Sequence, residues 1–210
     1  MAQSIKTSGY QWRNAAQTPI HADLLPSIDR QLNHLGLADE RKRIFDLGCG
    51  NGSVSNYYAL KGFDVVGIDS SETGIQQANT HYPNLKLYPG SAYDNLVEQY
   101  GQFPVVLSLK VVEHLYSPRI YAKTLFNLVE EGGLAIVSTP YHGYLKNLVL
   151  ALTGRMDAHF TVLWDHGHIK FWSVKTLTHL LKEAGFREVS FERVGRVAPL
   201  AKSMIATALK

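Results

Sequence analysis

Cysteine is almost absent from this chain of 210 residues, and so are long apolar runs. The one cysteine, Cys49, cannot form an internal disulfide, which excludes a disulfide-stapled secreted domain. No stretch approaches the roughly 18 or more apolar residues of a membrane-spanning helix, and residues 1–6 lack the apolar core of a signal peptide. We therefore expect a cytoplasmic protein that is not stably inserted in a membrane.

An excess of one charge sign is also missing. The 21 lysines and arginines are balanced by 18 acidic residues, for a formal net charge of +3, and the only tight basic run is 41–43. Proteins that bind nucleic acid normally carry a clustered basic face, so we expect no nucleic-acid partner. The apolar fraction of 45% is typical of a globular chain, and the length suits a single domain over 1–210.

The apolar pattern predicts an α/β fold, because short β-branched runs alternate with helical stretches as in a parallel sheet wrapped by crossover helices. The five strands expected are 43–47, 64–68, 85–88, 105–109 and 134–138, and the helices are 53–61, 73–81, 92–100, 118–130 and 174–184. Gly132 and Gly133 are expected to end the helix at 118–130. Two more strands, 187–194 and 204–209, would form an antiparallel C-terminal hairpin. The prediction is a doubly wound, mostly parallel, seven-stranded Rossmann-like sheet.

Two segments flank this alternation. We expect residues 1–40 to form an N-terminal helical cap, since 20–37 has helical spacing broken once by Pro26. We expect residues 140–172 to form a lid insertion on the substrate side. Within it, 144–152 reads as a short apolar helix, too short to span a bilayer. Packing on the domain is the preferred interpretation of this helix, and contact with a membrane surface or a lipid acceptor is the alternative.

The strongest local signal is the sequence Asp-Leu-Gly-Cys-Gly-Asn-Gly at 46–52, directly after a predicted strand and directly before a predicted helix. This context makes a glycine pattern informative. Glycines there let the backbone turn tightly and let a ligand approach closer than any Cβ would permit. The sequence therefore predicts a ligand site at the carboxyl edge of the sheet.

This loop resembles motif I of class I S-adenosylmethionine-dependent methyltransferases. The resemblance extends to three further strand ends, at 68–70, 89–92 and 107–114, and covers about residues 40–139. The run Val-Val-Glu-His-Leu at 111–115, followed by Pro118, is similar to the ubiquinone-biosynthesis O-methyltransferase group. The resemblance implies a methyltransferase with S-adenosyl-L-methionine as cofactor.

The resemblance also implies roles for residues of this chain. Asp69, followed by Ser70, would accept hydrogen bonds from both ribose hydroxyls, a geometry that suits a carboxylate. Gly48, Cys49 and Gly50 would line the methionine part, and Asp46 would favour its cationic amino end and repel a pyrophosphate. The remaining cofactor-binding residues implied are Ser91 and Ala92, beside the adenine, and Leu109, through its carbonyl. Ser91 departs from the family pattern, which often has an acidic residue there.

Methyl transfer needs mainly an in-line arrangement of acceptor, carbon and sulfur, which can supply roughly 7–11 kcal/mol. A phenolic acceptor would also use a general base, and we select His142 and His166 as the candidates. Both belong to a set of histidines with aromatic neighbours that suggests a pocket wall; the others in this set are His114, His159 and His168. No metal site is expected, since His166 and His168 lack a spaced carboxylate or thiolate cluster.

The function predicted is therefore methyl transfer to a small molecule, in particular O-methylation of a phenol or quinone precursor. Two alternatives remain. One is a nucleotide-dependent oxidoreductase, although the third glycine comes one position early for that fingerprint and Asp46 precedes the loop. The other is a non-catalytic methyltransferase-like binding protein. The sequence indicates neither the acceptor nor the oligomeric state.

Overall fold

The computed structural model describes residues 12, 14–160, 162–164 and 167–210, and its centre is one seven-stranded sheet. The strands are β1 Arg43–Leu47, β2 Asp64–Asp69, β3 Lys86–Pro89, β4 Phe103–Leu109, β5 Val129–Pro140, β6 Glu188–Val194 and β7 Ser203–Leu209. Their order is β3-β2-β1-β4-β5-β7-β6. The pairs formed by β7 with β5 and β6 are antiparallel and the others are parallel. The predicted fold is confirmed.

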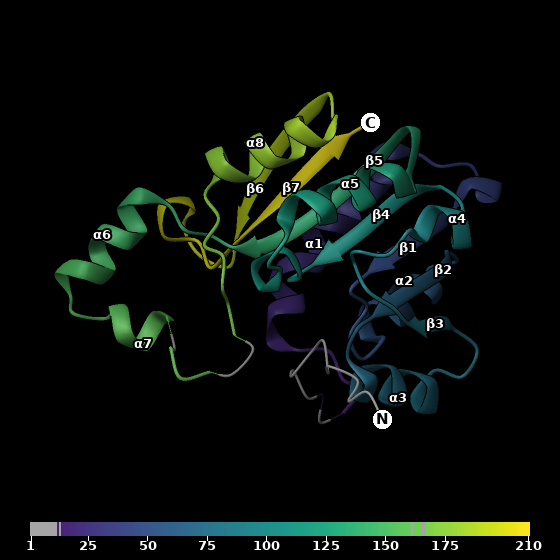
Figure 1. The fold of residues 1–210 in the computed structure, drawn as a ribbon, viewed down its shortest axis with the longest axis horizontal. Helices are drawn as coiled ribbons and strands as arrows, with labels where there is room; N and C mark the ends of the chain where they lie inside the picture. The colour runs from purple at the N-terminus through teal and green to yellow at the C-terminus, as the bar shows by residue number, and fades with distance from the viewer. Residues whose placement is uncertain (1–11, 13, 161, 165–166) are drawn as a thin grey trace, which may run out of the picture.

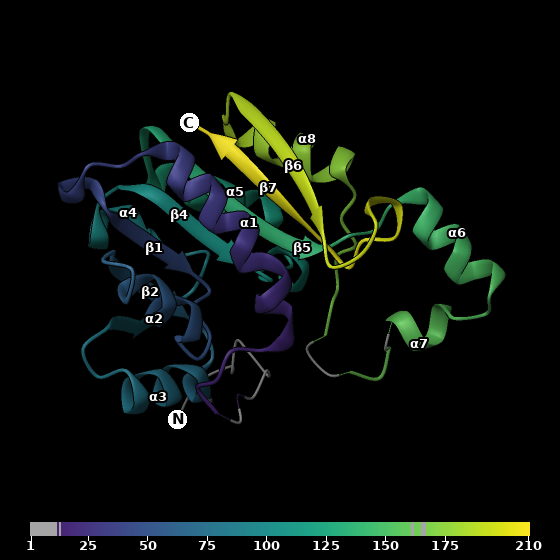
Figure 2. The same cartoon turned by 180° about the vertical axis from the view of Figure 1, so that it is seen from behind.

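Helices cover both faces of this sheet (Figures 1 and 2). The α-helices are α1 Pro19–Leu35, α2 Ser53–Ala59, α3 Glu72–His81, α4 Leu96–Tyr100, α5 Pro118–Leu128, α6 Tyr144–Leu152, α7 Met156–Phe160 and α8 Val174–Ala184; short 3-10 turns are η1 Asp39–Arg41, η2 Val112–His114 and η3 Ala198–Leu200. Helices α4, α5 and α8 bury apolar side chains on one face, and α1 and α2 do so on the other. Strand β4, in the middle, is buried along its whole length.

Local sequence explains where several helices begin and end. Ser173 precedes α8 and accepts a hydrogen bond from the backbone of Thr176, and Gly185 ends the helix in the left-handed conformation with a φ of 119°. Pro26 does not divide the leading segment, which is a single helix, α1. Two of its apolar side chains, Leu24 and Ile28, are fully buried. The burial of that face offsets the cost of an internal proline.

Three predicted helices were too long, and the one expected at 53–61 ends at Ala59. The helix expected at 92–100 begins only at Leu96, because Ser91 and Asp94 close a turn in which the Ser91 amide donates to Asp94 Oδ2 at 2.8 Å. The helix expected at 118–130 ends at Leu128, because Val129 already pairs with Phe103 of β4. The prediction that Gly132 and Gly133 end this helix was wrong: both lie inside β5.

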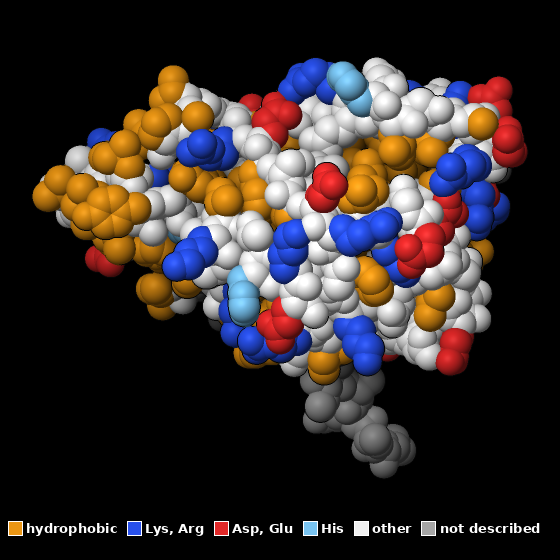
Figure 3. Space-filling view, turned by 90° about the horizontal axis from the view of Figure 1, so that it is seen from above, with side chains coloured by type: hydrophobic (Ala, Val, Ile, Leu, Met, Phe, Trp, Pro, Cys, Tyr) orange, Lys and Arg blue, Asp and Glu red, His pale blue; other side chains and the backbone are white. Residues whose placement is uncertain are grey.

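The segment that contains α6 and α7 projects from the end of the sheet (Figure 1). Apolar side chains gather on this projecting part, at the left of Figure 3. Tyr144 and Leu152 of α6 are 84% and 78% exposed. No helix among the described residues is long and apolar enough to cross a membrane. The division into a helical cap at 1–40 and a substrate-side lid at 140–172 remains a prediction.

Candidate functional site

The glycine loop connects β1 to α2 at the carboxyl end of the parallel strands. The amides of Gly48 and Cys49 both donate to the carbonyl of Ile68, at 2.9 Å, which ties the loop to β2. Gly50 has a φ of 55°, in the left-handed region, and a Cβ there would lie 2.4 Å from the Trp12 ring. The predicted need for glycine is therefore both conformational and steric at this position.

Asp69 ends β2 and holds the loop. Its Oδ2 accepts from the Gly50 amide at 2.8 Å, and its Oδ1 accepts from the Ser71 amide at 2.7 Å. Burial raises the pKa of this carboxyl, and the two backbone hydrogen bonds oppose the rise. Each oxygen of an ionised carboxylate can accept more than one hydrogen bond. Asp69 can therefore keep the loop in place and still accept from a ligand.

Asp46 is buried below the loop, with 2% of its surface exposed. Its Oδ2 accepts from the Ser55 hydroxyl at 2.6 Å. Burial raises its pKa to about 7; the Ser55 hydrogen bond opposes this rise and the charge of Asp69 adds to it. Two carboxyls that act on each other make this side of the site favourable for a cation, because a nearby positive charge stabilises both ionised forms.

The other predicted cofactor residues lie around this edge. Leu109 ends β4 and is buried, and Ser91 and Ala92 follow β3 in the turn closed by Asp94. Ser70 follows Asp69 and is exposed. The structure therefore brings the predicted residues to one edge of the sheet, and their contact with a cofactor remains a prediction.

Cys49 packs with Ile75, Ala78 and Leu87. Burial, with smaller contributions from Asp46 and Asp69, raises the pKa of its thiol well above the usual value. A buried thiol that resists deprotonation is a poor nucleophile. This agrees with a packing role for Cys49.

The N-terminal segment also reaches the loop, which sequence reasoning missed. The Trp12 ring lies against Gly50 and Gly74, and the Asn51 side chain donates to the carbonyls of Asn14 and Ala16, at 2.8 and 3.0 Å. No motif upstream of α1 marks these contacts. They depend on how the chain returns over the sheet.

His142 lies on the other side of the sheet edge, after β5. It is 7% exposed, and its ring contacts the rings of His159, Phe160 and Phe171 at centroid distances of 5.1 to 5.8 Å. Burial, together with the charge of Lys146, lowers its pKa to about 4. The imidazole is therefore neutral at pH 7, and its basicity is weak for a general base. His166, the other predicted base, is outside the described residues.

Sequence reasoning did not identify a further set of side chains, formed by the buried Glu113 and the half-buried His114 and His168. Potential ligand atoms of Glu113, His114 and His168 lie within 4.8 Å of one another. His168 thus meets a carboxylate that its sequence neighbourhood lacks, because η2 brings Glu113 to it. Lys110, the only non-glycine residue with positive φ (63°) in the described part of the chain, acts electrostatically on Glu113 and His168. Its positive charge disfavours a divalent cation there, and we assign no metal.

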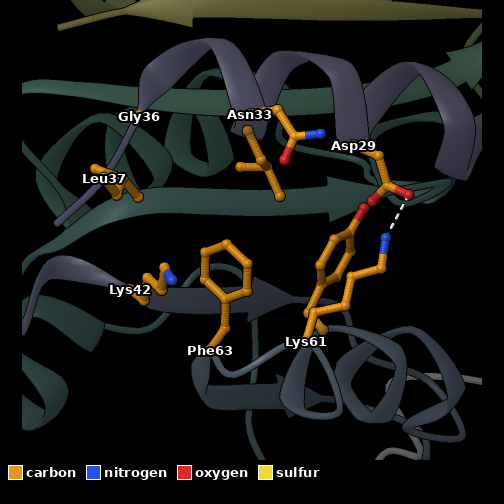
Figure 4. Close-up of a pocket in the computed structure, with 9 residues that line it drawn as sticks. Asp29, Asn33, Gly36, Leu37, Lys42, Lys61 and Phe63 are labelled. Atoms are coloured by element: carbon orange, nitrogen blue, oxygen red, sulfur yellow. Dashed lines mark hydrogen bonds and ion pairs between the residues drawn. The ribbon is translucent and has the colours of Figure 1, made fainter. Parts of the chain in front are cut away.

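A separate cavity of about 220 Å³ lies under α1 (Figure 4). Asp29 and Lys61 form an ion pair at its rim, at 2.5 Å. Lys42 and Phe63 line it and precede β1 and β2, so the cavity lies toward the amino end of these strands. An open α/β sheet binds its ligands at the carboxyl end, so this cavity is separate from the site.

Known proteins of one family match most of this chain. A family model described as a methyltransferase domain matches residues 20–190. A protein of a Caulobacter species named ubiquinone biosynthesis O-methyltransferase is 39% identical over 129 residues, which cover 60% of this chain and 50% of that relative. A protein of the same name from Ruegeria pomeroyi is 34% identical over 154 residues, which cover 70% of this chain and 60% of the relative. The chain thus spans about half to three fifths of these relatives.

The fold has counterparts among solved structures. A SAM dependent methyltransferase from Archaeoglobus fulgidus superposes with a TM-score of 0.67 at 15% identity, over 89% of this chain and 94% of that one. At this identity the likeness concerns the fold. It agrees with the strand order described above.

Proposed function

Since this chain belongs to the methyltransferase domain family, we propose that it is an S-adenosylmethionine-dependent O-methyltransferase whose acceptor is a small phenol or quinone precursor. The observation that carries the proposal is the hydrogen bond from the Gly50 amide to Asp69, which joins the glycine loop to the carboxylate of β2. This hydrogen bond lies at the end of β1, and the neighbours of β1 in the sheet are β2 and β4. The order of the strands reverses there, and open α/β sheets bind ligands at such a point.

The residues present fit the proposed cofactor. Asp46 and Asp69 make a region that favours positive charge, and S-adenosylmethionine carries a sulfonium and an ammonium group. The cofactor supplies an activated methyl group. The glycine loop would hold its amino-acid part, and Asp69 would bind its ribose. The same carboxyls disfavour a pyrophosphate, which argues against the oxidoreductase alternative.

An acceptor of the proposed class would lie near β4 and β5, toward His142. The protein's task there is to orient a phenolic oxygen and to exclude water. His142 is neutral and sits among aromatic rings, so we propose that it positions the acceptor through a hydrogen bond. His166 remains the proposed base. The names of the curated relatives support a phenol or quinone precursor.

The apolar surface of α6 supports a hydrophobic environment for this acceptor. Its exposed side chains are Tyr144, Leu145, Leu148, Val149 and Leu152. They fit either a long apolar substituent or the surface of a lipid bilayer. Contact of 144–152 with lipid, the absence of a nucleic-acid partner and a cytoplasmic location are parts of the proposal that remain to be measured.

Calorimetry tests the cofactor first. The protein is titrated with S-adenosylmethionine and, separately, with NADH, and Asp69→Ala serves as the comparison variant. Binding of S-adenosylmethionine alone, lost in the variant, is the expected result. A folded protein that binds neither compound would contradict the proposal. A protein that binds S-adenosylmethionine and methylates none of a panel of phenols would instead favour the non-catalytic alternative.

A further inference from the structure

Two lysines lie at the carboxyl end of β5 without an acidic partner. Lys110 Nζ donates to Ser203 Oγ at 2.7 Å, and Lys146 Nζ donates to the carbonyl of Tyr141 at 2.8 Å. In the described part of the chain neither ammonium group forms an ion pair. Both acceptors are neutral oxygens, so neither hydrogen bond neutralises the charge of its lysine.

The two ammonium groups belong to one region. Ser203 pairs with Pro140 across β7 and β5, and Tyr141 is the next residue after Pro140. The oxygens that hold the lysines therefore come from adjacent positions of the sheet edge. The two charges also act on each other and on His142, whose pKa both of them lower.

The burial of these lysines is unfavourable for the free protein. Lys146 is 8% exposed, and burial together with the charge of Arg196 lowers its pKa. Burial also lowers the pKa of Lys110, to about 8, so this group is still mainly charged at pH 7. A buried ammonium without a counterion costs free energy, and a bound anion would offset that cost.

The charges show which anion fits. Glu113 is fully buried and acts favourably on Lys110, while the charge that acts on Lys146 is the positive charge of Arg196. Asp23, which also acts on Lys110, is already paired with Lys202 at 3.1 Å. Lys110, Lys146 and Arg196 together outnumber the single carboxyl of Glu113, so the region keeps a net positive charge that a bound anion would offset.

We propose that Lys110 and Lys146 form a subsite for a carboxylate group carried by the acceptor, so that the substrate is a phenolic acid. This inference rests on the proposed function, because it places the acceptor beside a methyl donor. It divides the site into an acidic half at β1 and β2, suited to a cationic cofactor, and a basic half at β4 and β5, suited to an anionic acceptor. Such a division orients the two reactants with respect to each other.

The test compares catechol with protocatechuate, which differs from it by one carboxylate. Both are titrated into the protein by calorimetry, with and without saturating S-adenosylhomocysteine. Protocatechuate is expected to bind at least about tenfold more tightly than catechol, as hydrogen bonds to charged groups typically provide. In Lys146→Met this preference should fall below about threefold, and Lys146→Arg should retain most of it.

Lys123→Met is the matched control, because Lys123 is exposed on α5, and it should keep the preference. Unliganded Lys146→Met should unfold at the same temperature as the natural protein or higher, since the lysine would serve a ligand and not the fold. Should this variant fail to fold, Lys110→Met provides the same comparison.

Equal affinity for the two phenols, or no binding of either by a folded protein, would overturn the inference. The affinity for S-adenosylhomocysteine is read in the same experiment. Its loss would count against the proposed function, whereas cofactor binding without a carboxylate preference would count against the subsite alone.

Discussion

Asp69 and Gly50 are joined by a hydrogen bond of 2.8 Å between Oδ2 and the amide. The carboxylate proposed to bind the cofactor ribose thus also fixes the loop proposed to hold the methionine part. One side chain connects two neighbouring strand ends. Substitutions of Asp69 should therefore have two separable effects, one on cofactor affinity through the lost charge and one on stability through the loop.

Asp69→Asn keeps one oxygen, which can accept from Gly50 or from Ser71 but not from both, and it removes the charge. We expect its affinity for S-adenosylmethionine to fall roughly 10- to 100-fold, the range for hydrogen bonds to a charged group, with a smaller fall in melting temperature than Asp69→Ala causes. Asp69→Ala should lose the affinity and also unfold at a lower temperature, because the Gly50 and Ser71 amides lose their acceptors. Calorimetry and thermal unfolding measure the two effects. Equal melting temperatures for the two variants would contradict the loop-fixing role.

Gly50→Ala would add a methyl group to a left-handed residue and drive it against the Trp12 ring. Gly62→Ala is the matched control, since Gly62 also has positive φ, 86°, but has open space at that position. Both variants should lose about 1–2 kcal/mol of stability from the backbone conformation. Only Gly50→Ala should weaken cofactor binding, and adding Trp12→Ala to it should restore part of the stability. A control that weakens binding equally would refute the steric argument.

Asp46 should make stability depend on pH. Its pKa of about 7 in the folded chain exceeds the value of about 3.9 expected when unfolded. The unfolded state then releases the proton first, so the stability of the apo protein should decrease as the pH rises from about 4 to about 7.

Asp46→Asn should remove this dependence and be more stable than the natural protein at about pH 8, by on the order of 2 kcal/mol, while weakening cofactor binding. Denaturant unfolding at several pH values measures the difference between the two proteins, in which contributions from the histidines cancel. If the free energy of unfolding of the two proteins changed with pH in parallel, Asp46 would not be the group that causes the pH dependence.

His142 should act by position and not as the base. With a pKa of about 4, it does not change protonation state between about pH 5 and about pH 8. His142→Gln should reduce kcat/KM by about tenfold or less and leave the pH profile in place, whereas loss of a general base costs roughly 10²–10⁴-fold. His166→Gln is the comparison variant. A shifted pH profile in His142→Gln would reverse the assignment.

The apolar surface of α6 should bind lipid if the proposed surface contact occurs. Tyr144→Ser combined with Leu152→Ser should lower binding to anionic vesicles by roughly tenfold or more, because both side chains offer large exposed apolar area. Leu60→Ser is the control, since Leu60 is 81% exposed away from α6. Flotation with vesicles measures the binding. A natural protein that fails to float would end this part of the proposal.

The sequence by itself determined the sheet and its ligand edge. The alternation of β-branched and helical runs can be read from neighbouring residues along the chain. The Asp-Leu-Gly-Cys-Gly loop can be read in the same way, because its recognition needs only the strand before it and the helix after it. Local turn chemistry was harder to read: the Ser91–Asp94 turn shortened α4, and the pairing of Val129 with Phe103 placed Gly132 inside β5.

Only the tertiary structure decided which side chains share the acceptor side. Lys110 and Lys146 are 36 positions apart in sequence numbering, and their charges act on each other because β4, β5 and β7 end at one edge. Glu113 meets His168 for a similar reason, and Trp12 reaches Gly50 only because the chain ahead of α1 crosses the loop. Periodicity and spacing describe neighbours along the chain, whereas burial and uncompensated charge arise from contacts between distant segments.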